Sequence, residues 1–324
     1  MREIWKHLLV SCLMGIGIGV SIGVLGGGIL RQKDPGHSVR SNETTYRFIH
    51  PLLAFDTPKN NAGFGDLETR ITTVIEEAKT EGLETVSVYY RNQNVWMGID
   101  EDRGYIPASL YKVPLMIAYY RRAGNDPKIL QERILYPTPQ AVDAFYTLTP
   151  KTAYSLDELI QAMILKSDNG AAIALTSHIG SREFNEVLID LGLHPITPQD
   201  SRSNHEIQPE NYHRISAKNY AMFFRILYNA TYLDREYSER ALELLTRTSY
   251  NDGIVAGVPE HALVAHKYGH YIYPDGFEHE LHDCGFVYTG QSAYLLCVMT
   301  HGKNIDTLTD VIKKISALVF SASR

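Results

Sequence analysis

The sequence has few cysteines, no cluster of basic residues, no internal repeat and no His-Glu-x-x-His pattern. Three cysteines in 324 residues exclude a small scaffold held together by many disulfides. Acidic residues outnumber basic ones by 37 to 31, and the formal net charge is −6. Because no basic patch stands out, nucleic acid is not an expected partner. The missing histidine pattern argues against that class of zinc hydrolase, and no cofactor is predicted.

One long segment near the N-terminus lacks charge altogether. Residues 8–30 are rich in Leu, Ile, Val and Gly, and they follow a short basic segment, residues 1–7. A run of ~20 apolar residues spans a bilayer as a helix, whereas a cleaved signal peptide usually has a shorter core. We expect an uncleaved single-pass anchor in the cell membrane with a cytoplasmic tail, although cleavage or lipidation at Cys12 are alternatives. A polar linker, residues 31–61, would then carry an extracytoplasmic domain, residues 62–324.

Glycines recur at every fourth position of the predicted anchor and so share one helix face. The stripe consists of Gly15, Gly19, Gly23 and Gly27. Small residues at this spacing let two membrane helices approach closely, which makes self-association of the anchor one interpretation. The alternative is that the glycines are simply tolerated there.

The domain at residues 62–324 is large enough to bury one core. A helical stripe of apolar residues runs from Leu67 to Ala78, and the alternating segments 85–90 and 95–99 predict a hairpin after it. A strand at 293–300 and a helix after it close the chain. We expect an α/β fold of the α+β type. Its N- and C-terminal segments share one antiparallel sheet, and the helical middle forms a second lobe.

Residues 107–114 contain the first catalytic candidates, Ser109 and Lys112. Residues three apart lie on one face of a helix, so the hydroxyl and the amine would point the same way. A serine hydroxyl is a poor nucleophile until a neighbouring base takes its proton. A lysine can be that base if burial or nearby charge lowers its pKa. Pro114 predicts a helix that starts close to Ser109. Taken alone, the spacing is equally typical of a capped surface helix.

Two more motifs follow in order along the chain. Ser-Asp-Asn at 167–169 ends a helix that opens with a capping box at Ser155, and Lys-Tyr-Gly at 267–269 precedes a predicted strand. Each motif alone has a plainer interpretation, a polar turn or a surface lysine. Together, Ser-x-x-Lys, Ser-Asp-Asn and Lys-x-Gly resemble the class A β-lactamase-like serine hydrolases, within the superfamily of β-lactamases and penicillin-binding proteins. The resemblance runs from about residue 64 to the C-terminus.

The resemblance implies the β-lactamase/transpeptidase-like fold and a catalytic role for three of these residues. Ser109 would be the nucleophile and Lys112 the general base, and Ser167 would relay a proton to the leaving nitrogen. Two backbone N–H groups, those of Ser109 and His270, would form the oxyanion hole. Backbone donors suit that task because they are fixed where negative charge develops.

The same resemblance implies a set of substrate-binding residues. Asn169 would hydrogen-bond the substrate amide, while its neighbour Asp168 would be structural. Lys267 would form a cationic wall near the substrate carboxylate, with Tyr268 and Gly269 beside it.

Two positions depart from the family pattern. Tyr268 stands where a threonine or serine normally offers a short hydroxyl to the substrate carboxylate. The Glu-x-x-Leu-Asn pattern of the glutamate that activates the deacylating water is missing from residues 193–215. Glu206 and Glu210 lie in this segment, and Glu206 is the preferred deacylation base, the alternative being a solvated loop carboxylate. Without such a base the enzyme would acylate and then stall.

Histidines and acidic residues surround the third motif. They are His261, His266, His270, His279 and His282, with Glu278, Glu280 and Asp283 nearby. The run from His279 to His282 is one residue too short for the zinc pattern. We interpret most of these histidines as loop residues and keep a metal site as the minor alternative.

Two of the three cysteines flank a predicted hairpin near the C-terminus. If Thr289 and Ser292 close a two-residue turn, Cys284 lies opposite Cys297. Cross-strand neighbours come close enough for a disulfide, which an extracytoplasmic location would permit. Two buried free thiols are an equal alternative.

The sequence therefore predicts a membrane-anchored, extracytoplasmic serine hydrolase that opens β-lactam amides through an acyl-serine intermediate. A D-alanyl-D-alanine carboxypeptidase or transpeptidase acting on cell-wall peptide would use the same chemistry. A different class is a penicillin-binding or sensor module with little turnover. The motif residues on which all three depend are Ser109, Lys112, Ser167, Asn169 and Lys267.

Overall fold

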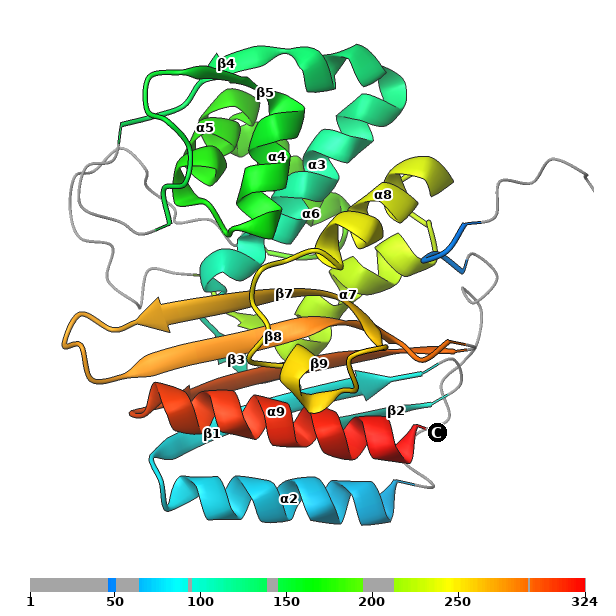
Figure 1. Cartoon of the computed structure of the whole chain (residues 1–324), viewed down its shortest axis with the longest axis vertical. Coiled ribbons are helices and arrows are strands. Elements are labelled where there is room, and N and C mark those ends of the chain that lie inside the picture. Colours follow the sequence, from blue (N-terminus) through cyan, green and yellow to red (C-terminus); the bar gives the residue numbers. More distant parts are fainter. Residues whose placement is uncertain are drawn as a thin grey trace, which may run out of the picture. The chain divides into compact units, whose positions relative to one another are not determined.

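Figure 1 shows the computed structural model, which describes residues 46–50, 64–92, 95–138, 145–194, 213–290 and 292–323. The predicted anchor at 8–30, its glycine stripe and most of the predicted linker lie outside these residues. Among the helices that are described, none combines the length and the apolar character needed to cross a bilayer.

One antiparallel sheet of five strands, in the order β2-β1-β9-β8-β7, forms the base of the domain. Its strands are β1 (Leu83–Arg91), β2 (Trp96–Ile99), β7 (Leu263–Ile272), β8 (His279–Tyr288) and β9 (Ala293–Gly302). Because β1 pairs with β9, segments from the two ends of the domain share one sheet, which confirms the prediction. Strand β7 lies at an edge of the sheet, and in Figure 1 this edge faces the helical lobe.

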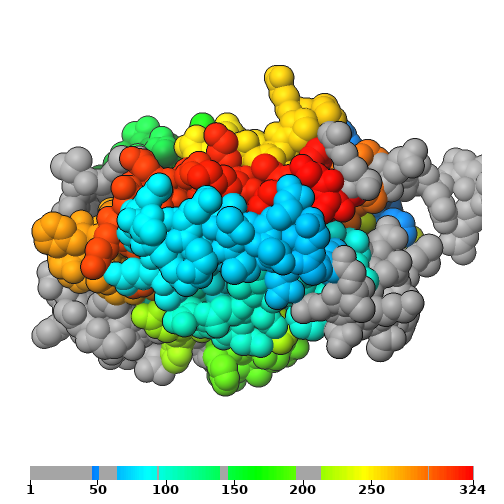
Figure 2. Space-filling view, turned by 90° about the horizontal axis from the view of Figure 1, so that it is seen from below, coloured from blue at the N-terminus to red at the C-terminus, as the bar shows by residue number. Residues whose placement is uncertain are grey.

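Helices α2 (Gly65–Lys79) and α9 (Ile305–Ala322) cover one face of the sheet. Figure 2 shows them side by side across this face. Each helix buries the apolar stripe that its sequence predicts, because residues three and four apart share a helix face. The buried residues include Leu67, Ile71, Ile75, Leu308, Ile312, Ile315 and Val319. Burial of one such aliphatic side chain is worth about 1.5–3 kcal/mol relative to exposure.

The second lobe is helical, as predicted. Its helices are α3 (Lys112–Asn125), α4 (Leu156–Leu165), α5 (Asn169–Ile179), α6 (Ser181–Asp190), α7 (Ala217–Tyr228) and α8 (Arg235–Leu245). The short elements are η2 (Ala108–Tyr111), η3 (Pro127–Gln131), η5 (Val255–Gly257), and two small antiparallel pairs, β3 (Gly104–Tyr105) with β6 (Ile215–Ser216) and β4 (Arg133–Leu135) with β5 (Ala153–Ser155). Helix α7 packs on the second face of the sheet and belongs to the larger core.

The predicted capping box opens α4. The Ser155 hydroxyl accepts a hydrogen bond from the Glu158 N–H at 3.2 Å, and the Glu158 carboxylate accepts one from the Ser155 N–H at 2.7 Å. These two bonds satisfy donors that have no partner within the helix. The helix therefore begins at a fixed residue, and the Ser-Asp-Asn segment follows its C-terminal end.

Residues 46–50, which the sequence assigns to the linker, pack against the domain. The carboxylate of Glu239 on α8 accepts hydrogen bonds from the N–H groups of Arg47, Phe48 and Ile49, at 2.5 to 3.0 Å. Phe48 and Ile49 are buried, and the Phe48 ring meets the Tyr288 ring edge-on at 5.3 Å. The packed domain thus includes residues that precede position 62.

Cys284 and Cys297 are direct cross-strand partners on β8 and β9, and they form a disulfide. The Thr289 N–H donates to the Ser292 carbonyl at 2.8 Å, so the predicted two-residue turn is confirmed. Of the two alternatives left open by the sequence, the structure has the disulfide rather than two free thiols.

The histidines around the third motif lie mostly in strands, so their interpretation as loop residues is wrong. His266 and His270 belong to β7, His279 and His282 belong to β8, and His261 alone of these five precedes the strands. Two of these histidines, His266 and His282, are buried, and each lies within hydrogen-bond distance of a polar group. The Nδ1 atom of His266 lies 2.7 Å from the Asp283 carboxylate, and the Nε2 atom of His282 lies 2.9 Å from the Ile106 carbonyl oxygen. A pattern of alternating residues does not reveal such long-range partners.

Candidate active site

Ser109 and Lys112 meet where η2 passes into α3. Lys112 is the first residue of the helix, and its Nζ atom lies 3.0 Å from the Ser109 hydroxyl oxygen. Pro114 occupies the first turn of α3, where the absence of an N–H costs nothing. Ala108, directly before the nucleophile candidate, has a φ of 45°. A non-glycine residue in this left-handed region is strained, so the packing around η2 must hold the turn in place.

The Ser-Asp-Asn segment connects α4 to α5 and surrounds the Lys112 amine. Lys112 Nζ donates to the Ser167 carbonyl at 2.6 Å, and it lies 3.1 Å from the Ser167 hydroxyl. It also donates to the Asn169 side-chain oxygen at 2.7 Å. Lys112 is fully buried while Ser109 is half-buried. The amine is thus held under a hydroxyl that remains open to solvent on one side.

Lys267 reaches the same hydroxyl from the sheet. It lies on the edge strand β7, and its Nζ atom donates to the Ser167 hydroxyl oxygen at 3.0 Å. Burial lowers the pKa of Lys267 well below its ordinary value, and the nearby Lys112 lowers it further, whereas Asp283 opposes the shift. Ser167 therefore bridges two buried amines, and the charged form of one of them is disfavoured. Such an arrangement can pass a proton between the two lysines through one hydroxyl.

Gly269 brings the edge of β7 directly against η2. A Cβ atom at this position would lie 2.9 Å from the Pro107 carbonyl oxygen and 3.2 Å from the Leu110 nitrogen. Only a glycine lets two backbones come this close. The backbone of Gly269 thereby lies beside Pro107 and Leu110, on either side of Ser109 in the chain, while the oxyanion hole of the Ser109 and His270 N–H groups stays a prediction.

Tyr268 belongs to an aromatic pair at the same edge. Its ring stacks on that of Tyr250 with centroids 4.1 Å apart, and Lys267 Nζ lies 4.5 Å from its centroid. Burial raises the pKa of Tyr268 and outweighs a hydrogen bond with Ser167, which lowers it. The paired rings of Tyr268 and Tyr250 thus stand where the family pattern has a short threonine or serine side chain. Tyr250 comes from the irregular segment before η5, and nothing in its sequence context marks it.

Asp168 supports the site without contacting Ser109 or Lys112 in any described interaction. Its buried carboxylate accepts hydrogen bonds from the Tyr136 hydroxyl, from the N–H and the hydroxyl of Thr147, and from the Ala171 N–H, all at 2.6 to 3.0 Å. The structural role inferred for Asp168 agrees with this geometry. Sequence reasoning missed Tyr136 and Thr147, because they precede Asp168 by 32 and 21 residues.

Glu206 and Glu210, the candidates for the deacylation base, lie outside the described residues. The described residues contain one group of potential metal ligands that converge, Glu84, Glu278 and His301. Both ring nitrogens of His301 face these carboxylates, at 3.4 Å from Glu84 and 3.2 Å from Glu278. None of the five histidines considered for a metal site in the sequence belongs to this group.

His270 makes the stability of the domain depend on pH. Burial, together with the neighbouring His279 and His282, lowers its pKa to about 4 from the ordinary 6.5. Between these two pH values the unfolded chain binds a proton that the folded protein does not, so stability falls as the pH falls through this window. Because His270 is partly open to solvent, we expect a loss of about 1–2 kcal/mol, less than the full shift implies.

The measurement is urea unfolding at pH 7 and at pH 4.5, for the wild type and His270→Asn. The variant lacks the titrating group, so its stability should depend less on pH by about the same 1–2 kcal/mol. Equal pH dependence in both proteins would show that His270 does not cause the effect.

Comparison with known proteins gives a consistent result. The sequence model described as the Beta-lactamase enzyme family matches residues 66–322. Among solved structures, PBP-A aligns with a TM-score of 0.68 at 22% identity, over 83% of this chain and 99% of its own. A β-lactamase from Chitinophaga pinensis aligns with a TM-score of 0.70 at 18% sequence identity, over 80% of this chain and 100% of its own. A class A β-lactamase from Mycobacterium abscessus aligns with a TM-score of 0.67 at 21% sequence identity, over 78% of this chain and 99% of its own. A search of curated proteins returns no significant match.

Proposed function

The chain belongs to the Beta-lactamase enzyme family and is a serine hydrolase of the β-lactamase type, and we propose that it opens β-lactam amides through an acyl-serine intermediate. One observation carries the proposal. The Lys112 amine contacts the hydroxyls of both Ser109 and Ser167, and Lys267 contacts Ser167 from the opposite side. A nucleophile, a base and a proton relay thus lie in one hydrogen-bonded series.

In the proposed acylation, the Ser109 oxygen attacks the carbonyl carbon of the amide. Lys112 accepts the hydroxyl proton as the new C–O bond forms, at a distance of 3.0 Å in the free enzyme. The N–H groups of Ser109 and His270 stabilise the negative charge on the carbonyl oxygen. As the C–N bond breaks, Ser167 gives its proton to the departing nitrogen and regains one from Lys112. The serine ester and a free amine result, and all protons are accounted for.

Deacylation needs a base that activates water, and we assign this role to Glu206. If Glu206 does not act, the enzyme stays acylated and behaves as a penicillin-binding protein. A carboxypeptidase or transpeptidase acting on cell-wall peptide is therefore the second candidate. Tyr268 does not separate the two candidates, because a β-lactam and a D-alanyl-D-alanine peptide both carry a carboxylate that a short hydroxyl at this position would meet.

We also propose that the domain acts outside the cytoplasm, carried by an anchor at residues 8–30 that associates with itself through its glycine stripe. The Cys284–Cys297 disulfide supports this location, because disulfides persist in oxidising compartments and are rare in the cytoplasm. The apolar length of the N-terminal segment supports the anchor.

The test incubates the purified full chain and its Ser109→Ala variant with a chromogenic cephalosporin. Hydrolysis is followed by absorbance, and covalent adducts are followed by intact mass. Turnover that is lost in the variant would establish β-lactam hydrolysis through Ser109. An adduct on Ser109 without turnover would favour the penicillin-binding candidate. If the wild type shows no adduct and no turnover, β-lactam recognition is refuted.

A further inference from the structure

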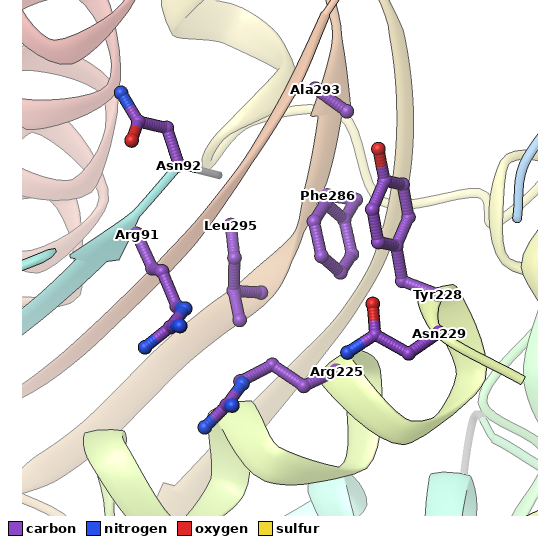
Figure 3. A pocket seen from close by; sticks show the side chains of 8 residues that line it. All are labelled: Arg91, Asn92, Arg225, Tyr228, Asn229, Phe286, Ala293 and Leu295. Atoms are coloured by element: carbon purple, nitrogen blue, oxygen red, sulfur yellow. The ribbon is translucent and has the colours of Figure 1, made fainter. Parts of the chain in front are cut away.

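A second polar pocket lies between the C-terminal end of α7 and the sheet (Figure 3). Its lining includes Arg91 of β1, Arg225 and Tyr228 of α7, Asn229, Phe286 of β8 and Leu295 of β9. None of these residues belongs to the hydrogen-bonded cluster around Ser109. The pocket is therefore not part of the site described above, and the proposed function gives it no role.

Two guanidinium groups of this pocket are near each other, and no carboxylate among the described residues pairs with either of them. In Figure 3, the side chains of Arg91 and Arg225 both extend into the space beside Leu295. Neither forms an ion pair with a described carboxylate, and both are partly buried. Burial lowers the pKa of Arg225, and the positive charge of Arg91 lowers it further. The two groups thus repel each other where solvent screens them poorly.

The helix terminus offsets only part of this charge. Arg225 lies in the last turn of α7, where the helix dipole favours a cation. That terminus is equivalent to roughly half a negative charge, whereas two guanidinium groups carry two positive charges. A structural role at the helix end would therefore need one arginine and would not explain the second.

We propose that the pocket binds a phosphate group, either as the free ion or as a monoester. Phosphate carries a charge of about −1.5 to −2 at neutral pH, which matches two arginines better than a carboxylate does. Planar guanidinium groups bind phosphate oxygens in a bidentate manner. The hollow measures about 30 Å³, which suits one small anion and is far below the roughly 300 Å³ of an ordinary ligand site.

The other lining residues fit such a ligand. The rings of Tyr228 and Phe286 stack with centroids 4.2 Å apart and form a rigid apolar wall. The side-chain amide of Asn229, which Figure 3 places between Tyr228 and Arg225, adds a neutral donor. The wall reduces the screening of the arginines by water, which strengthens their attraction for an anion.

The experiment titrates inorganic phosphate into the full chain by calorimetry, in an amine-free buffer at constant ionic strength. We expect saturable binding by the wild type and at least tenfold weaker binding by Arg91→Gln and by Arg225→Gln. Arg182→Gln is the matched control, because Arg182 is an exposed arginine paired with Glu186 on α6, and it should bind like the wild type. Glycerol phosphate, titrated in parallel, distinguishes a site open to monoesters from one restricted to the free ion.

Thermal unfolding separates binding from a structural role. Without phosphate, each pocket variant should have a Tm equal to or above that of the wild type, because one of two repelling charges is gone. With phosphate, only the wild type and Arg182→Gln should gain stability. The proposal fails if acetate binds as tightly as phosphate, if all four proteins respond equally, or if both pocket variants lose stability while the wild type ignores phosphate.

Discussion

Replacing Lys112 by methionine is expected to lower the rate of Ser109 acylation by about 10³-fold, within the range that a general base contributes. The amine is fully buried and holds the hydroxyls of Ser109 and Ser167 and the side-chain oxygen of Asn169. Methionine is an unbranched side chain one atom shorter than lysine, and it can neither accept the serine proton nor hold these oxygens. Intact mass of the protein against time, with a penicillin in excess, gives the acylation rate directly.

The matched control is Lys128→Met, which makes the same change at an exposed lysine on η3. It should acylate at the wild-type rate. If Lys112→Met acylates within tenfold of the wild type, another group takes the Ser109 proton, and Lys267, which bonds to Ser167, becomes the next candidate.

The three-residue spacing of Ser109 and Lys112 predicted their contact correctly, although the local helix type differs from the one expected. The sequence indicated one helix face, whereas Ser109 lies on the 3-10 turn η2 and Lys112 begins the α-helix. Residues three apart meet in both forms, and in a 3-10 turn they eclipse each other. The prediction therefore did not depend on which helix type forms there.

The two-lobed fold followed from similar regularities. Apolar stripes at helical spacing fixed the positions of α2 and α9, and alternation fixed β1 and β2. The pairing of β1 with β9 joins residues that are about 200 positions apart, and it was predicted from the order of the elements along the chain, not from a pattern within either strand. Periodicity identifies an element but does not identify its partner.

Contacts that depend on loops were not predictable from the sequence. Tyr250 stacks on Tyr268 from an irregular segment, and no period marks a residue there. The strand histidines were assigned to loops, although His266 and His270 belong to β7 and His279 and His282 to β8. Their partners are far along the chain: Asp283, beside His266, comes from the neighbouring strand, and the Ile106 carbonyl, beside His282, comes from the segment before η2.

The Asp168→Ala substitution is expected to lower the free energy of unfolding by about 3–5 kcal/mol, the range for breaking a buried network around a charge. The carboxylate is fully buried and serves donors from three separate segments: Tyr136, Thr147 and Ala171. Alanine leaves buried donors without an acceptor, and each such donor costs about 1–3 kcal/mol. Urea unfolding of the full chain measures the change.

Two comparisons show whether the loss comes from this network. Asp126→Ala removes an exposed aspartate that caps η3 through the Lys128 N–H, and it should cost about 1 kcal/mol. Tyr136→Phe removes one donor to Asp168, so its effect should largely vanish in the Asp168→Ala background.

Because Asp168 is adjacent to Ser167 and Asn169, acylation of Ser109 should slow as well, although Ser109 and Lys112 are unchanged. Two results together would contradict this role of the carboxylate. Asp168→Ala would lower the free energy of unfolding by less than about 1 kcal/mol, and the effects of Asp168→Ala and Tyr136→Phe would add in the double variant. The carboxylate would then not hold the Ser-Asp-Asn segment in place.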